Sequence, residues 1–417
     1  MLVAKTVYTP AKAQMQEVAR LLAKTAHETA ELDPLEFLRQ RSEDVLAALR
    51  DDIFAPEGIK TLRKTWSISD AAELAGRSQQ SIRLAEKDGK LPEPERLDSG
   101  RRRGYSLDAI NRMREVFGTR PWRAPTDEPV IISFSNFKGG VGKSSFACHS
   151  AQYFAIRGYR VLLVDLDSQA STTTVFGFNP DLQITPEDTI AAYLLGEQHT
   201  LHYAIKHTHW PGVDLIPSAL HFYGAEYELA AQVSGNVELL ESLRAGIDGV
   251  ADSYDLILLD PPPALGLVSI SALVAANALV IPVPPANIDF ASTSHFFGMV
   301  IDTLASLRRH GVDPSYKFLK VALSKFDERK STQAAIVEMM RQVFGNYLLT
   351  TPIKDSAEID NASARFETVY EQPGPLTSRE VHRRCITYLD GLNRELETLV
   401  RRTWPSHHDG LRKAGLM

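Results

Sequence analysis

A short glycine-rich stretch carries the residues with the clearest chemical meaning. Residues 138–144 have the sequence Lys-Gly-Gly-Val-Gly-Lys-Ser, after the apolar run Val130–Asn136 and before a predicted helix. Glycines at this spacing let the backbone curl so that its N–H groups point at phosphate oxygens, and the N-terminus of the helix adds partial positive charge. Lys143 would place its charge on the β- and γ-phosphates, and the Ser144 hydroxyl would ligate Mg²⁺. The stretch therefore predicts a nucleotide-binding loop made of Gly139, Gly140, Val141, Gly142, Lys143, Ser144 and Ser145.

Three aspartates follow apolar runs and are candidates to hold a metal ion or a water molecule. Asp165 and Asp167 come at the end of Val161–Val164, and Asp260 ends Leu256–Leu259 just before three prolines. Open α/β sheets bind their ligands beyond the carboxyl ends of the strands, where carboxylates can hold metal-bound water or orient an attacking water. We expect Asp260 to hold Mg²⁺ through water. The proline-rich turn that follows would be the switch that senses the γ-phosphate.

Six short apolar runs, separated mostly by helical stretches, must position these residues. This alternation predicts an α/β domain, a mostly parallel, doubly wound sheet with helices on both faces, which we assign to residues 130–405. The expected strands are Val130–Asn136, Arg160–Asp165, Val213–Pro217, Leu256–Asp260, Leu279–Pro284 and Phe318–Ser324. An amphipathic helix at Ser378–Arg402 closes the domain, and residues 406–417 are expected to be a polar tail.

Two further units precede the sheet. Residues 1–60 are predicted to form an all-α arm, because apolar residues recur at helical spacing from Met15 to Ala26 and again from Leu35 to Ile53. Such a helical pair cannot bury itself well alone, so it either caps the next domain or mediates dimerisation. Residues 61–120 have the rhythm of a winged helix–turn–helix domain, and the proline-bearing residues 121–129 form a linker. The expected elements of 61–120 are a helix capped by Ser69 that runs through Leu74, a helix at Ser78–Glu86, a basic wing at 99–105 and a helix at Ser106–Phe117.

Composition limits the classes of function. A formal net charge of −6 over 417 residues argues against a cationic nucleic-acid binder, so any contact with DNA must use local basic patches. The two cysteines, Cys148 and Cys385, stand in unrelated contexts, which suits a reducing cytoplasm. No apolar run approaches the length of a membrane span. We expect a soluble cytoplasmic protein that does not bind membranes.

The phosphate loop resembles that of the ParA/MinD-type ATPases, the deviant Walker A family. Phe137 stands where the ordinary P-loop has its first glycine, and the early Lys138 matches the family pattern K-G-G-x-G-K-[S/T]. The resemblance implies that Lys138 reaches across a nucleotide-sandwich homodimer to the partner's phosphates, so that ATP binding and dimerisation are one event. It also assigns to Asp167 the orientation of the attacking water and to Asp165 a place near Mg²⁺. The family usually has proline where this chain has Ser168, which implies a less rigid loop here.

Other segments are similar to the long plasmid-partition ParA proteins and to the RepA proteins of repABC replicons. They are residues 136–140, 165–171, 324–329 and 354–359, together with the N-terminal extension that short chromosomal ParA proteins lack. This resemblance implies a DNA-segregation ATPase that associates with the nucleoid, hydrolyses ATP to ADP slowly until a ParB-type centromere-binding partner stimulates it, and represses its own operon. A slow reaction agrees with the absence of an evident arginine finger or strong general base from the motifs.

DNA binding is expected at two surfaces. Specific operator binding would place the helix Ser78–Glu86 in a major groove, with a basic loop against phosphates or a minor groove. The residues for this are Gln79, Gln80 and Arg83 on the helix and Arg101, Arg102 and Arg103 on the loop, whose alternative interpretation is a solvated loop tip. By resemblance, non-specific binding would use Lys325, Arg329 and Lys330. A further patch around Lys354 is less basic than in short ParA proteins, because Asp355 and Glu358 lie beside it.

Two alternatives stay open at this point. The first is a transcriptional repressor that uses the nucleotide only as a conformational switch, which the helix–turn–helix pattern would equally suit. The second is a MinD-like membrane ATPase, suggested by the amphipathic helix at Ser378–Arg402.

Overall fold

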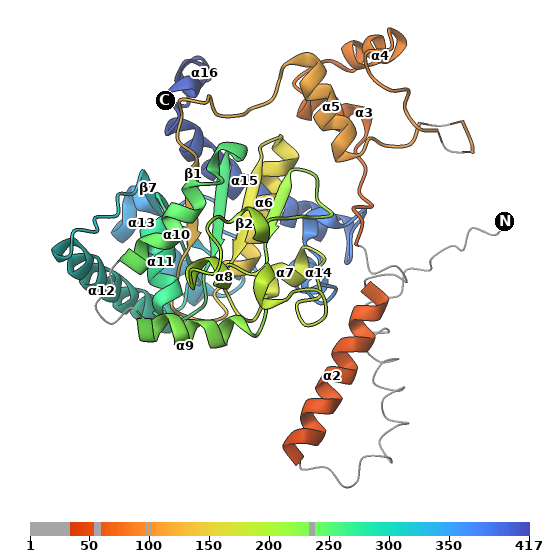
Figure 1. The fold of residues 1–417 in the computed structure, drawn as a ribbon. Coiled ribbons are helices and arrows are strands. Elements are labelled where there is room, and N and C mark those ends of the chain that lie inside the picture. The colour runs from red at the N-terminus through yellow and green to blue at the C-terminus, as the bar shows by residue number, and fades with distance from the viewer. Residues whose placement is uncertain (1–33, 54–59, 97, 101, 233–237) are drawn as a thin grey trace.

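The computed structural model describes residues 34–53, 60–96, 98–100, 102–232 and 238–417. The second predicted helix of the arm is present as α2 (Pro34–Ile53) (Figure 1). The first predicted helix and Arg101 lie outside the described residues. The role of the arm, as a cap or as a dimerisation element, therefore stays a prediction.

A sheet of seven strands forms the centre of the molecule. Its order is β3-β4-β2-β5-β1-β6-β7, and every pairing is parallel except that of β3 with β4. The strands are β1 (Val130–Phe134), β2 (Val161–Asp165), β3 (Lys206–His207), β4 (Val213–Ile216), β5 (Leu256–Asp260), β6 (Ala278–Val283) and β7 (Phe318–Leu323). All six predicted strands are confirmed. The additional β3 has two polar residues at the edge of the sheet and shows no apolar pattern in the sequence.

Helices cover both faces of the sheet, which confirms the doubly wound α/β fold (Figure 1). On one face α6 and α15 bury the side chains of Val130, Ile132 and Phe134. On the other face α8, α9, α10 and α11 pack against Ile131, while α12 and α13 cover β6 and β7. The helices of this sheet domain (residues 130–405) are α6 (Lys143–Arg157), α7 (Ser171–Val175), α8 (Ala191–Leu194), α9 (Phe222–Gln232), α10 (Glu238–Asp248), α11 (Leu267–Ala275), α12 (Asn287–Arg309), α13 (Ser331–Phe344), α14 (Ala357–Ser363) and α15 (Arg379–Arg402).

The C-terminal helix α15 packs inside the domain. Its Asn393 accepts a hydrogen bond of 2.7 Å from Ser150 on α6, and its Glu397 accepts one of 3.0 Å from Tyr153. After it, α16 (His408–Lys413) buries Leu411. Within the part of the chain that the structure describes, no helix is long and apolar enough to cross a membrane. The amphipathic face that suggested a MinD-like membrane ATPase is thus occupied by the protein's own core.

The N-terminal unit (residues 61–120) contains three short helices at the predicted places, α3 (Ile68–Leu74), α4 (Gln79–Lys87) and α5 (Leu107–Phe117). The expected N-cap Ser69 is wrong. Ser67 caps α3, because Asp70 follows at the third helical position and completes a capping box. The predicted wing shows two isolated antiparallel bridges, Trp66 with Tyr105 and Arg96 with Arg102.

This unit docks directly on the sheet domain. The buried Arg114 of α5 donates hydrogen bonds to Ile156 O at the end of α6 and, at 3.1 Å, to Leu74 O. Trp122 donates one of 3.0 Å to Gly158 O. The predicted linker is itself packed, since the buried Arg123 donates to Asp127 O (2.6 Å) and to carbonyls of the sheet domain. One continuous hydrophobic core runs from the N-terminal unit into the sheet domain.

Candidate nucleotide site

The glycine-rich loop has the curled backbone that phosphate binding requires. Gly140 and Gly142 have φ of +72° and +97°, in the left-handed region that side chains disfavour. Gly142 is the N-cap residue of α6, so Lys143, Ser144 and Ser145 form the first turn of that helix. The free N–H groups of this turn and the positive end of the helix dipole therefore lie where the loop curls.

The two lysines of the loop lie at its mouth. The Lys143 ammonium is 3.5 Å from Lys138 O, and the side chain is mostly buried. Burial lowers the pKa of Lys143, while the negative charges of Asp260 and Asp167 oppose this shift. Phosphate oxygens would favour the charged form by the same attraction. Lys138 is half-buried, and its N–H donates to Asn136 Oδ1 at 3.0 Å.

Asp165 and Asp260 are direct neighbours, because β2 and β5 pair in register at these two residues. Asp165 is fully buried. Its Oδ2 accepts bonds from Thr173 N (2.8 Å) and Thr173 Oγ1 (2.7 Å). Burial and the adjacent Asp260 raise the pKa of Asp165 well above its usual range, although these hydrogen bonds oppose the shift. Two buried carboxylates side by side repel each other and favour a cation between them.

The two carboxylate oxygens of Asp260 differ in their hydrogen bonding. Its Oδ2 accepts a 2.7 Å hydrogen bond from Thr172 Oγ1, whereas its Oδ1 is buried without a hydrogen-bond partner in the described part of the chain. Burial raises the pKa of Asp260 to about 6, against the hydrogen bond from Thr172, the nearby Ser144 hydroxyl and the charge of Lys143. An orphaned buried oxygen normally has a role.

These donors fit Mg²⁺. Mg²⁺ takes oxygen ligands and keeps several waters, so one or two carboxylates, a hydroxyl and phosphate oxygens are sufficient. Ser144 and Asp260 supply the hydroxyl and the carboxylate at the start of α6 and the end of β5. Among the residues described, no cluster of three or more His, Cys, Asp or Glu side chains forms a separate metal centre. Asp165 stands behind Asp260, tied to Thr173.

Asp167 lies at the opening of the site. It is half-buried, and its N–H donates to Asp165 Oδ1 at 3.1 Å while its Oδ1 accepts from Gln169 N at 2.9 Å. These bonds fix the 165–169 turn so that Asp167 lines the same cleft as Lys143. The structure thus brings Lys143, Ser144, Asp165, Asp167 and Asp260 together, as the sequence predicts.

The cleft has a volume of about 440 Å³ and includes residues that sequence reasoning did not assign. Its far wall comes from the end of β7 and from α14 with the loop before it. The unassigned lining residues are Phe146, Gln169, Ser171, Pro263, Ser324, Ile353, Asp355, Ser356, Ile359, Asp360 and Ser363. The segment 354–359, named from the sequence for its family resemblance and for a weak DNA patch at Lys354, contributes to this wall of the nucleotide cleft.

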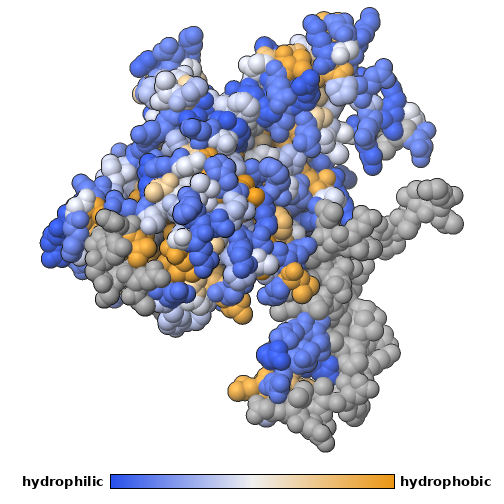
Figure 2. All heavy atoms as spheres, viewed as in Figure 1, coloured by the Kyte–Doolittle hydropathy of each residue, from blue (hydrophilic) through white to orange (hydrophobic). Residues whose placement is uncertain are grey.

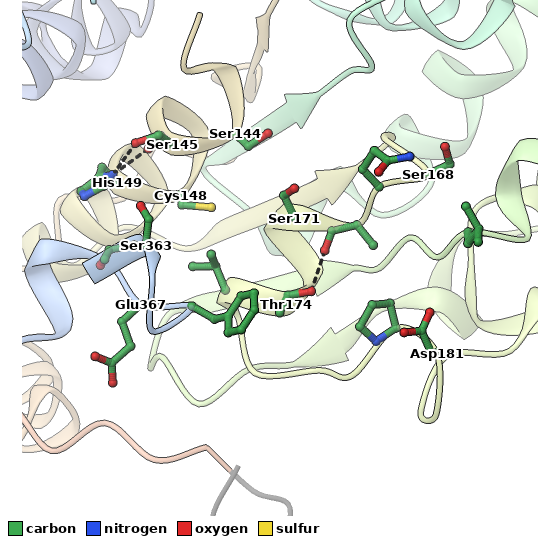
Figure 3. Close-up of a pocket in the computed structure, with 17 residues that line it drawn as sticks. Ser144, Ser145, Cys148, His149, Ser168, Ser171, Thr174, Asp181, Ser363 and Glu367 are labelled. Carbon is green, nitrogen blue, oxygen red and sulfur yellow. Dashed lines mark hydrogen bonds between the residues drawn. The ribbon is translucent and has the colours of Figure 1, made fainter. Parts of the chain in front are cut away.

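A second cavity, of about 530 Å³, adjoins the cleft and shares Ser144 and Ser145 with it. Figure 3 shows its walls: the start of α6, the side of α7 with Ser171 and Thr174, and Ser363 and Glu367 at and after the end of α14. One side of α7 therefore faces open space.

The predicted operator-contacting residues are exposed in part. Gln79, Gln80 and Arg83 are exposed on α4, whose opposite side is buried. Arg102 instead donates to Glu86 Oε2 and to the Tyr105 hydroxyl, both at 2.8 Å, and so ties the loop to α4. Arg103 pairs with Glu95 at 3.1 Å and remains exposed.

The three residues expected to bind DNA non-specifically occupy different settings. Arg329 donates to both oxygens of Asp327, at 2.8 and 3.0 Å, and Lys330 lies 3.7 Å from the same carboxylate. Both are exposed. Lys325, with φ of +52°, lines the nucleotide cleft.

Much of the remaining exposed apolar surface lies away from this site. In Figure 2 the visible surface is mainly hydrophilic, with hydrophobic atoms gathered low in the view, where Figure 1 shows α9 and α12. Large exposed apolar or aromatic side chains there are Tyr223, Tyr227, Met299 and Ile301, whereas the exposed Leu220 lines the second cavity.

Known proteins resemble this chain in sequence and in fold. A sequence family described as an AAA domain matches residues 130–307. SopA of Escherichia coli strain K12 is 38% identical over 335 residues, which cover 78% of this chain and 85% of SopA. A putative replication protein A of Rhizobium rhizogenes is 29% identical over 367 residues, covering 84% of this chain and 90% of its own. A solved structure of a partition protein has the same fold, with a TM-score of 0.63 at 22% identity over 94% of this chain and 98% of that chain.

Proposed function

Since this chain belongs to the family of ParA-type plasmid partition ATPases, we propose that it segregates a replicon through an ATP-dependent cycle of dimerisation and DNA binding. The observation that carries this proposal is the arrangement of the cleft. A curled glycine loop and the buried Lys143 line the cleft, and beside them lies Asp260, a buried carboxylate with one oxygen that has no hydrogen-bond partner among the described residues. Such a site binds a nucleoside triphosphate with Mg²⁺.

Each side chain has a task in hydrolysis. The Lys143 ammonium and the N–H groups of the first turn of α6 bind the β- and γ-phosphates. Ser144 and Asp260 would hold Mg²⁺, which when bound withdraws negative charge from the phosphate oxygens. Asp167 orients a water molecule for attack on the γ-phosphate. Lys138 reaches the phosphates of the partner subunit in a nucleotide-sandwich homodimer, so binding of ATP and dimerisation are coupled.

The first experiment is Lys143→Ala. We expect loss of ATP binding and of ATP-dependent binding to non-specific DNA, because charge on the phosphates is no longer balanced. Lys413→Ala, an exposed lysine of α16, is the matched control and should behave as wild type. ATP-dependent DNA binding that survives Lys143→Ala would overturn the proposal.

The second experiment separates Lys138 from Lys143. Lys138→Ala should keep ATP binding and lose the ATP-induced dimer, measured by light scattering with a non-hydrolysable analogue. If dimerisation persists in this variant, the sandwich arrangement is wrong. The proposed ParB-type partner is tested in the same preparation, since it should raise the ATPase rate of wild type in the presence of DNA.

Autorepression is proposed on the exposure of Gln79, Gln80 and Arg83 on one side of α4. Arg83→Ala should weaken binding to the protein's own promoter region, at a cost of about 1–3 kcal/mol for a base contact, and leave non-specific binding unchanged. A promoter footprint identical to wild type would remove α4 from this role.

A repressor that uses ATP only as a switch is the second candidate. The continuous core between the N-terminal unit and the sheet domain favours communication of this kind. A plasmid-loss assay discriminates the two, because Lys138→Ala should destabilise a replicon only if the dimer cycle moves DNA.

A further inference from the structure

Lys60, just before the N-terminal unit, is inserted into the sheet domain. Its ammonium is buried and donates to Val175 O (2.7 Å) and Phe366 O (2.9 Å), and it forms an ion pair with Glu371 at 2.7 Å. These three acceptors satisfy all three donors of the ammonium. A lysine is rarely buried unless it is paired in this way.

One of these acceptors, Val175, lies at the C-terminal end of a short helix whose first turn contacts Asp165 and Asp260. Val175 is the last residue of α7, a helix of only five residues. At the other end of α7, Thr172 donates to Asp260 and Thr173 donates twice to Asp165. The short helix therefore connects the carboxylates directly to the Lys60 ammonium.

The same lysine also reaches the phosphate-loop helix. Glu371 accepts from Gln152 of α6 at 3.0 Å and lies 3.3 Å from His209 Nε2. Gly177, two residues beyond α7, permits the close approach of Lys60, since a Cβ there would lie 2.9 Å from Lys60 Cβ. Glu371 thus holds α6 and Lys60 at one point.

One side of α7 borders the second cavity, whereas Thr172 and Thr173 on the helix are fully buried. Val175 and Phe366, whose carbonyls accept hydrogen bonds from Lys60, both line the second cavity. A helix of five residues has no stability of its own and depends on contacts at its ends. Lys60 supplies such a contact across the cavity wall.

We propose that Lys60 is a positioning residue for the carboxylates of Asp165 and Asp260 and acts on them through α7. Lys60, which directly precedes the N-terminal unit, then helps to support the nucleotide site. A displacement of Lys60 changes the position of these carboxylates, and a change at the carboxylates displaces Lys60. The inference rests on the proposed function in one respect, namely that these carboxylates serve Mg²⁺ and a nucleotide.

The first test uses the full-length protein without metal or nucleotide. Lys60→Met removes the charge, and Lys60→Met combined with Glu371→Gln also removes the buried carboxylate that would be left unpaired. Hydrogen exchange of the amides of residues 171–177 should accelerate about tenfold or more in both. The amides of β5 should not change, and Lys87→Met, at an exposed lysine of α4, should match wild type throughout.

The second test measures the Mg²⁺ concentration at half-maximal stabilisation by ADP, followed as a thermal shift. We expect the midpoint to rise about tenfold in the Lys60 variants, as for loss of a residue that supports a metal ligand. Binding of ADP in EDTA should be unaffected. Thr172→Val should shift the midpoint in the same direction, and its combination with Lys60→Met should add little, because both act on one path.

The outcomes are distinct. Wild-type exchange in α7 and a wild-type Mg²⁺ midpoint in a folded Lys60 variant overturn the inference, as does simple additivity with Thr172→Val. Failure of the Lys60 variants to fold leaves Thr172→Val, in which an unchanged Mg²⁺ midpoint is equally decisive against it. A wild-type protein without any Mg²⁺ dependence would instead contradict the proposed function, and the exchange test in metal-free protein would still stand.

Discussion

At the scale of single residues, two carboxylates, Glu371 and Asp327, are each paired with a positively charged side chain, the first in the interior and the second at the surface. Glu371 is buried, which alone would raise its pKa, but Lys60 and His209 more than offset this and hold the pKa at about 2. Asp327 is held by the exposed Arg329 and Lys330, with its pKa also at about 2. The Glu371 pairing is buried in the interior, whereas the Asp327 pairing is accessible to a competing anion. The two pairings therefore lead to different predictions.

Glu371→Gln should remove a contribution to the free energy of unfolding that exists only while the Glu371 carboxylate is ionised. The pKa of Glu371 is depressed from 4.5 in the unfolded chain to about 2, so the ionised carboxylate stabilises the fold above pH 4.5 and this contribution is lost as pH falls towards 2. The difference in unfolding free energy between wild type and variant should be about 3 kcal/mol at pH 7 and fade across this window. Urea unfolding at a series of pH values measures it. Glu338→Gln, on the surface of α13, should show no such trend, and a constant difference for Glu371→Gln would contradict the prediction.

Asp327→Asn should strengthen non-specific DNA binding. The carboxylate accepts hydrogen bonds from Nε and Nη2 of Arg329 and attracts Lys330, so it competes with phosphate for both side chains. We expect tighter binding and a salt dependence steeper by about one phosphate contact, in titrations at several salt concentrations. Arg329→Ala should have the opposite effect. Unchanged affinity in both variants would place the DNA surface elsewhere.

At the scale of elements, two helices that start at the nucleotide site, α6 and α7, are held at their far ends by residues that precede the sheet domain in the chain. Arg114 and Trp122 bind the carboxyl end of α6, and Lys60 binds that of α7. Both helices begin at phosphate or carboxylate ligands. The α6 C-cap, Gly158, is closely packed, since a Cβ there would lie 2.9 Å from three atoms of the Arg114 side chain.

Gly158→Ala and Gly118→Ala make a matched pair. Both glycines end helices with positive φ, at +100° and +63°, but nothing lies within 4 Å of the position a Cβ would take at Gly118. Gly118→Ala should cost about 1 kcal/mol from backbone strain alone. Gly158→Ala should cost about 3 kcal/mol, because the hydrogen bonds of Arg114 are displaced as well. Chemical denaturation measures the change in unfolding free energy of each variant. Equal costs would show that the Arg114 side chain can move aside without loss of stability.

The central strands β1, β2 and β5 were predictable because each is buried on both faces and appears as an apolar run between helices. The phosphate loop and the aspartates were predictable because their spacing is tied to local backbone geometry. Lys60 was not, since its partner Val175 is 115 positions away and a single lysine carries no pattern. The cap at Ser67 was missed because Ser67 and Ser69 both suit a cap, and only the position of Asp70 decides between them.

At the scale of the whole molecule, the core is continuous from the N-terminal unit to α15. We therefore expect a single calorimetric transition for both parts, with equal calorimetric and van't Hoff enthalpies. ADP with Mg²⁺ should move that one transition to higher temperature. An earlier transition that does not respond to nucleotide would show that the N-terminal unit unfolds independently.

The place of β1 in the sheet has a consequence for synthesis on the ribosome. β1 precedes the phosphate loop in the chain, yet it lies between β5 and β6, whose residues 256–260 and 278–283 are made more than a hundred positions later. At elongation rates of about 5–20 residues per second the nascent loop waits on the order of ten seconds for its neighbours. During that interval the N-terminal unit is already complete and exposed outside the ribosome. A newly made chain therefore presents its first helices before it can hold a nucleotide, and cofactor loading is a late event in its maturation.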